Sequence, residues 1–124
     1  MPLPTAKLAP ALTALAVGAL LAGCGQTHRV GAGRSLQMTV TEYRLCPQDV
    51  SMGAGTVAIL VHNLGRLTHN LAVTEDGQLV AATDGIPPGS SAELDLSLAP
   101  GRYLLASTIL SDQSLGLYGT LTVS

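Results

Sequence analysis

The chain has 124 residues, a formal net charge of −2, no tryptophan or phenylalanine, and only three tyrosines. A chain of this length supplies one small domain with a modest, aliphatic core. Nucleic acid is excluded as a partner, because the sequence has neither a basic patch for phosphate contact nor enough aromatic side chains for base stacking.

The N-terminal segment combines one positive charge with an apolar run. Lys7 precedes a nearly unbroken apolar stretch over residues 8–22, and no acidic residue comes before it. This order is typical of a secretory signal peptide. A single membrane-spanning helix is the alternative, but such a helix needs roughly 20 apolar residues, and this run is shorter and contains Pro10. We therefore predict a signal peptide over residues 1–23.

The apolar run ends in Leu21-Ala22-Gly23-Cys24, which resembles a bacterial lipobox. The resemblance implies cleavage before Cys24 and attachment of a diacylglyceryl group to its sulfur. Two or more acyl chains, palmitate for example, hold a protein stably on a membrane. The mature chain is thus expected on the extracytoplasmic face of the cell membrane. Because Gly25 follows the cysteine instead of an aspartate, the outer membrane remains open in a Gram-negative cell.

Residues 24–35 are expected to form the lipidated end and a linker. Residues 26–34 are polar and contain glycine without an apolar period, which favours a flexible tether with a solvated His28. If Cys24 carries lipid, Cys46 has no intramolecular partner, and a disulfide framework is excluded. Cys46 is then interpreted as a small buried hydrophobe.

Residues 36–124 show short alternating segments separated by Gly, Pro, Asn and Asp. Such a pattern predicts strands and not helices. Asp76-Gly77 suits a hairpin turn between two of these strands. Met38 and Met52 are interpreted as core residues and His62 as a satisfied or edge-facing histidine. The predicted strands lie at residues 36–42, 56–63, 70–74, 78–83, 90–98, 102–109 and 119–123.

Seven or eight short strands in one small domain predict an all-β sandwich. Antiparallel pairing is expected, with one end strand open to a parallel arrangement. On the strand over residues 102–109, Tyr103, Leu105 and Ser107 are expected to share one face.

Four fragments in order resemble the cupredoxins, the copper-binding β-sandwiches that include plastocyanin and azurin. The resemblance spans residues 36–124 and implies a Greek-key sandwich. The fragments lie at residues 50–57, 61–71, 86–91 and 98–103, the last leading to residues 116–123.

The resemblance also implies a set of metal-ligand positions. His69 matches the family's first copper ligand. The positions of the cysteine, histidine and methionine ligands carry Ser107, Asp112 and Leu117. A blue-copper centre needs a thiolate, two imidazoles and a weak axial ligand. Serine and leucine supply none of these, so we predict a degenerate site and no resident cofactor. The alternative is a weak divalent or Cu(II) site made by His69, Asp112 and water.

Leucines and prolines take the place of the metal ligands in the loops that the family brings together. They either fill the vacant metal pocket or form an exposed apolar patch that docks a partner protein. The residues of this patch are Leu64, Leu67, Ile86, Pro87, Pro88, Leu110, Leu115 and Leu117.

Two functions remain open from the sequence. The first is a lipid-anchored, copper-free binding or interaction module. The second is a copper-binding cupredoxin that carries electrons or sequesters copper through His69 and non-standard ligands. Enzyme activity is not expected, because Ser107 and His69 lack the elbow and oxyanion glycines of a hydrolase.

Overall fold

The computed structural model describes residues 24–124. The predicted signal peptide over residues 1–23 lies outside the described residues. Within residues 24–124, no helix is long and apolar enough to cross a membrane.

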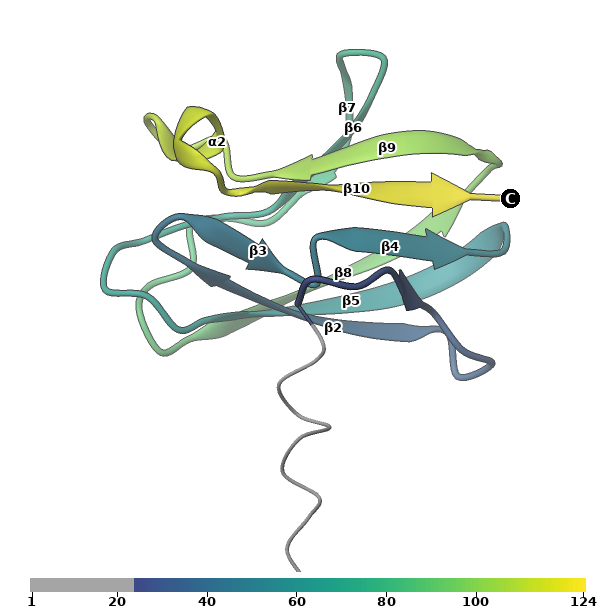
Figure 1. The fold of residues 1–124 in the computed structure, drawn as a ribbon, viewed down its shortest axis with the longest axis horizontal. Helices are drawn as coiled ribbons and strands as arrows, with labels where there is room; N and C mark the ends of the chain where they lie inside the picture. Colours follow the sequence, from purple (N-terminus) through teal and green to yellow (C-terminus); the bar gives the residue numbers. More distant parts are fainter. Residues whose placement is uncertain (1–23) are drawn as a thin grey trace, which may run out of the picture.

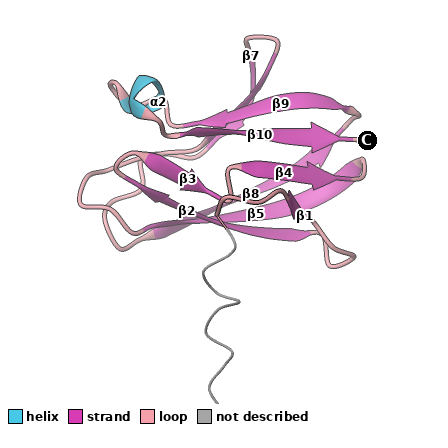
Figure 2. Ribbon diagram, in the orientation of Figure 1, coloured by secondary structure: helices cyan, strands magenta, loops and turns pink. Residues whose placement is uncertain are grey.

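The regular secondary structure of the described part is almost all strand, with one four-residue helix before the last strand (Figures 1 and 2). This confirms the predicted all-β sandwich. The elements are β1 (His28–Arg29), β2 (Ser35–Thr41), β3 (Arg44–Cys46), β4 (Asp49–Met52), β5 (Gly55–Asn63), β6 (Ala72–Glu75), β7 (Gln78–Ala82), β8 (Ser91–Leu98), β9 (Gly101–Ala106), α2 (Asp112–Leu115) and β10 (Tyr118–Val123).

The strands form two sheets that face each other. One sheet has the order β1-β4-β10-β9-β6-β7, and the other has the order β3-β2-β5-β8. Pairing is more mixed than expected, because β2 with β5, β4 with β10, and β1 with β4 are all parallel. Because β2 and β5 are parallel, their carboxyl ends lie side by side at one end of the sandwich, where Val40 pairs with Asn63.

The inward faces of the two sheets make one aliphatic core, as the alternation predicts. Every second residue of β5 is buried, and Met38 and Met52 are only 1% and 0% exposed. Tyr103 is the one aromatic residue of this core, and its hydroxyl donates to the Ala99 carbonyl. Among the described residues, the core extends from Val30 to Val123.

The segment expected to be a flexible tether is instead part of the sandwich. His28 is exposed but pairs with Val50 in the β1–β4 ladder, and Val30 is buried. The Arg34 guanidinium donates to the carbonyl oxygens of Gly53, Ala54 and Thr56. The prediction of a flexible tether over residues 26–34 is thus wrong, because edge pairing and a buried valine hold the segment in place.

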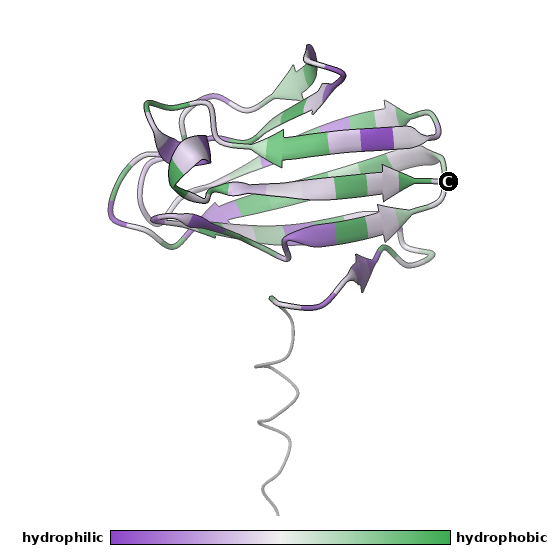
Figure 3. Ribbon diagram, turned by 45° about the horizontal axis from the view of Figure 1, so that its top comes forward, coloured by the Kyte–Doolittle hydropathy of each residue, from purple (hydrophilic) through white to green (hydrophobic). Residues whose placement is uncertain are grey.

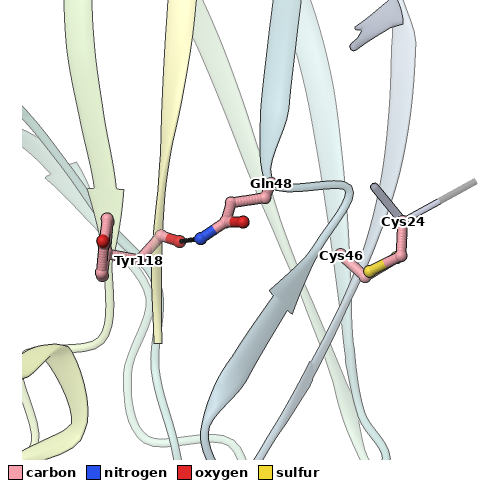
Figure 4. Close-up of a disulfide and its surroundings, with 4 residues drawn as sticks. All are labelled: Cys24, Cys46, Gln48 and Tyr118. Carbon is pink, nitrogen blue, oxygen red and sulfur yellow. Dashed lines mark hydrogen bonds between the residues drawn. A yellow bond between two sulfur atoms is a disulfide. The ribbon is translucent and has the colours of Figure 1, made fainter. Parts of the chain in front are cut away.

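Cys24 and Cys46 are joined by a disulfide, with their Cα atoms 4.9 Å apart (Figure 4). In this structure Cys46 therefore has an intramolecular partner, whereas the sequence alone predicted none on the condition that Cys24 carries lipid. The reason is the β1–β4 register, which pairs His28 with Val50. The same offset of 22 residues places Cys24 beside Cys46. Cys46 is also only partly buried, and not the enclosed hydrophobe that was predicted.

Candidate functional site at the loop end of the sandwich

Three connections meet at one end of the sandwich, which we call the loop end. They follow β5, precede β8 and join β9 to β10 through α2. His69 is fixed by two backbone hydrogen bonds with Ile86, one in each direction. Ser107 directly follows β9, Asp112 begins α2 and Leu117 directly precedes β10. The predicted ligand positions thus come together, although Ser107 lies just beyond its strand.

Asp112 joins two of these side chains through a single carboxylate oxygen. Its Oδ2 atom lies 2.7 Å from His69 Nδ1 and 2.7 Å from Ser107 Oγ. Because a carboxylate only accepts, the imidazole donates from Nδ1 and the serine hydroxyl donates as well. His69 and Ser107 are 0% exposed and Asp112 is 5% exposed. The three side chains form a buried hydrogen-bonded network, which we call the Asp112 network.

Asn70 extends this network to the backbone of the loop after β9. Its Oδ1 atom accepts from the Thr108 amide at 2.8 Å and lies 3.0 Å from Ser107 Oγ. Its Nδ2 atom donates to the Thr108 hydroxyl at 2.9 Å. The loop that carries Asp112 is therefore tied to the residue that follows His69.

Glu42, the residue after β2, lies on the opposite side of His69. One carboxylate oxygen accepts from the amides of Arg66 and Leu67 at 2.5 and 2.7 Å. Partial burial acts to raise the pKa of Glu42, but these amides and the nearby His69 imidazole lower it to below the usual 4.5. The same oxygen lies 3.7 Å from His69 Nε2, too far for a hydrogen bond. Nε2 is the buried side-chain atom that has no hydrogen-bond partner among the described residues.

Asn63 holds the loop that leads to His69. Its Nδ2 atom donates to the carbonyls of Leu67 and Ile86 at 2.8 Å, and its Oδ1 atom accepts from the Gly65 amide at 2.7 Å. A Cβ at Gly65 would lie on the Glu42 carboxylate, so any other residue there would displace this side chain. These hydrogen bonds fix the conformation of the segment from Asn63 to Asn70, which carries His69.

The loop-end leucines separate into two groups. Ile86 and Leu117 are 2% and 0% exposed, so they belong to the core. The prediction that these two residues form part of an exposed docking patch is therefore wrong. The others are exposed around the Asp112 network, and Figure 3 shows hydrophobic segments in these loops beside hydrophilic ones. We call this exposed group the leucine rim: Leu64 (60% exposed), Leu67 (54%), Leu110 (97%) and Leu115 (55%). Pro87 and Pro88 are exposed in the neighbouring connection.

The donors at the loop end do not fit a type 1 copper ion. Ser107 offers a hydroxyl in place of a thiolate, and Leu117 has no lone pair. His69 Nδ1 and Asp112 Oδ2 are already bonded to each other. Within residues 24–124, no group of three His, Cys, Asp or Glu side chains is placed to hold a metal ion.

The same geometry argues against a serine nucleophile. A general base has to lie within hydrogen-bond reach of the hydroxyl that it activates. In this site the carboxylate of Asp112 lies between the two groups, so Ser107 donates to Asp112 and not to the imidazole.

The remaining candidate residues lie away from the loop end. His62 Nδ1 lies 2.6 Å from the Ser91 hydroxyl on the outer face of its sheet, as expected of a satisfied histidine. His28, Cys46 and His62 border a separate cavity there. Sequence reasoning missed Glu42, Tyr43 and the supporting role of Asn70. Glu42 and Tyr43 belong to the β2–β3 turn, and only the parallel β2–β5 pairing brings that turn to His69.

No family model matches the chain, and no curated protein sequence matches it. Solved structures do match. An auracyanin from Roseiflexus castenholzii has 19% identity and a TM-score of 0.70, over 76% of this chain and 99% of that chain. The blue copper protein auracyanin A from Chloroflexus aurantiacus has 17% identity and a TM-score of 0.67, over 77% and 99%. Rusticyanin from Thiobacillus ferrooxidans has 14% identity and a TM-score of 0.66, over 86% and 90%.

These proteins are cupredoxins, and the likeness confirms a cupredoxin-like β-sandwich. At such identities it shows the fold alone. The function has to be argued from the side chains of this chain.

Proposed function

We propose that the protein is a membrane-anchored, extracytoplasmic interaction module that has the cupredoxin-like fold and has lost type 1 copper. The observation that carries this proposal is the Asp112 network. A carboxylate oxygen joins His69 and Ser107 at 2.7 Å each, and Leu117 is buried beside them. The interior of the loop end is thus already closed by hydrogen bonds and packing.

The leucine rim supports a role in binding. Leu110 is 97% exposed and has a φ of 49°, a left-handed backbone that a leucine rarely adopts. Backbone strain of this kind concentrates at functional sites. Four exposed leucines around one end are an apolar surface of the sort that docks a partner. Tyr43 adds to this surface, since it is 38% exposed beside the rim.

The proposed anchor is a diacylglyceryl group on Cys24. A thioether and a disulfide cannot share one sulfur atom, so the lipidated chain would carry Cys46 as a free thiol. Only three residues separate Cys24 from β1. The lipid would therefore attach almost directly to the folded domain and hold it close to the bilayer.

A copper-binding protein is the second candidate, supported by the cupredoxin-like fold and by His69 at the first ligand position. It would have to break the bond between His69 and Asp112. It would also have to recruit a third ligand, which the described residues do not place there.

The docking role is tested with the double variant Leu67→Gln and Leu115→Gln, purified from membranes under mild detergent. Both side chains are about half exposed, so the change in unfolding free energy should stay within about 0.5 kcal/mol. Partners that co-purify with the wild type should be lost from the double variant. Leu79→Gln is the matched control, because Leu79 is 66% exposed on β7, outside the rim. Unfolding of the double variant, or retention of its partners, would refute the proposal.

A further inference from the structure

A cavity of about 370 Å³ opens beside the Asp112 network. It lies between the β2–β3 turn, the loop after β5 and the segment that carries α2. Its wall is mostly apolar, with Tyr43, Leu67, Ile109, Leu110 and Leu115, and Asp112 is its one acidic residue. This is the size and composition of a small-molecule site: a concave apolar space with few polar groups.

The carboxylate in this wall has an unused oxygen. Both hydrogen bonds of Asp112 run through Oδ2, and Oδ1 receives none from any described residue. The residue as a whole is 5% exposed, yet Oδ1 is not among the buried polar atoms that lack a partner, so this oxygen can be reached from outside. A donor or cation supplied by a molecule in the cavity would form a charge-assisted hydrogen bond with it.

The local charge favours a cation. Asp112 and Glu42 lie on the two sides of the His69 imidazole, with a carboxylate oxygen 2.7 Å from Nδ1 and 3.7 Å from Nε2, respectively. No arginine or lysine of residues 24–124 pairs with either carboxylate. Two carboxylates therefore face at most one positive group, and the loop end keeps a net negative charge beside the cavity. The exposed Tyr43 ring, which meets His69 edge-on at 6.4 Å, adds a π surface that attracts cations.

We propose that this cavity binds a small organic cation, an ammonium group on an apolar body, with the cation at Asp112 Oδ1 and the body against Tyr43, Leu67 and Leu115. Leu110 stands at the mouth, where it would cover the bound body. The proposal goes beyond the docking function and does not depend on it.

The test uses residues 24–124 with Cys24→Ser, ¹⁵N-labelled, titrated with hexylammonium and with its neutral and anionic counterparts, hexanol and hexanoate. Hexylammonium should shift the amides of Tyr43 and of residues 109–115. It should bind about tenfold or more tightly than hexanol, the factor expected when one charged hydrogen bond distinguishes the two. Hexanoate should not bind. Equal binding of hexylammonium and hexanol, or shifts confined to other residues, would overturn the proposal.

Variants separate charge from apolar contact. Asp112→Asn should remove the preference for hexylammonium over hexanol, whereas Leu115→Gln should weaken both ligands alike. Glu93→Gln, at an exposed acid on β8, should change neither. If Asp112→Asn does not fold, the affinities of hexylammonium, hexanol and hexanoate for the domain with only Cys24→Ser still test the proposal. Binding of an acetyl-Leu-Lys-Leu-amide peptide without hexylammonium binding would assign the site to a protein side chain and refute the small ligand. Partner loss in the leucine double variant is a separate readout, so docking can hold while this inference fails.

Discussion

At the scale of single residues, the Oδ2 atom of Asp112 is the point where His69 and Ser107 meet. In a blue-copper centre a metal ion joins a cysteine thiolate and two imidazoles. In this chain a carboxylate oxygen makes the connection. Buried polar groups of this kind stabilise a fold only while each has a partner, so the network ought to be sensitive to the loss of its acceptor.

Asp112→Ala should therefore destabilise the domain strongly. It removes the acceptor of two buried donors, and each buried donor left without a partner costs about 1–3 kcal/mol. Urea unfolding measures the change. Asp84→Ala is the control, because Asp84 is exposed and its loss should cost no more than about 0.5 kcal/mol. Similar losses in the two variants would show that the Asp112 network contributes little.

Glu42 should make stability depend on pH. Its folded-state pKa is lowered, so its contribution is full above the usual value of 4.5 and is lost as the pH falls through the lowered pKa. The wild type should thus be more stable than Glu42→Gln near neutral pH, and the two should converge in acid. Urea midpoints of both proteins over this range give the comparison.

Glu93 provides a control of opposite sign. Its side-chain hydrogen bond with Asp95 and the repulsion between the two acids raise its pKa. The charged form is penalised in the folded state, so Glu93→Gln should be the more stable protein near neutral pH, with the difference fading in acid. The same sign for both variants would contradict the assignment of these shifts.

At the scale of elements, alternation predicted the long strands well. β5 and β8 lie close to their expected ranges, and Ala92, Leu94 and Leu96, at alternate positions of β8, pack against the core. The shortest elements were missed. β1, β3 and β4 have two, three and four residues, too few to show a period, and α2 has only four.

Part of the candidate site could also be predicted. His69, Ser107, Asp112 and Leu117 converge because the fold places their loops together. The hydrogen bond between His69 and Asp112 was not predicted, since it depends on the path of the β9–β10 connection through α2. The Cys24–Cys46 pairing likewise follows from the β1–β4 register, which no local pattern of a two-residue strand reveals.

Hydrogen exchange tests whether β1 belongs to the fold. The Val30 amide donates to Ser51 at 2.9 Å and the Arg34 amide donates to Gly31 at 3.0 Å. Both should exchange much more slowly than an unstructured peptide, and the Val30 amide should be the slower because it joins two segments. If both amides exchange at the rate of an unstructured peptide, the segment is a flexible tether and β1 is not a stable part of the fold.

At the scale of the whole molecule, the proposed anchor and the loop end are distinct regions. Cys24 lies beside the end of β3 (Figure 4), whereas α2 and its neighbouring loops lie at one end of the long axis (Figure 1). A lipid on Cys24 would thus leave the leucine rim free to meet a partner.

Intact mass of the membrane-purified protein decides the chemistry of Cys24. We expect a chain that begins at Cys24 and carries a diacylglyceryl group, with Cys46 open to alkylation without prior reduction. Cys46→Ser should not change the lipid mass. An unlipidated chain whose two cysteines react only after reduction would refute the anchor and support the disulfide.

The most direct test of the central claim is copper analysis of residues 24–124 with Cys24→Ser, after exposure to Cu(II) and removal of loosely bound metal. If the Asp112 network has replaced the metal, the domain should retain far less than one copper per chain and show no intense visible thiolate band. Stoichiometric, tightly held copper with such a band would contradict the account.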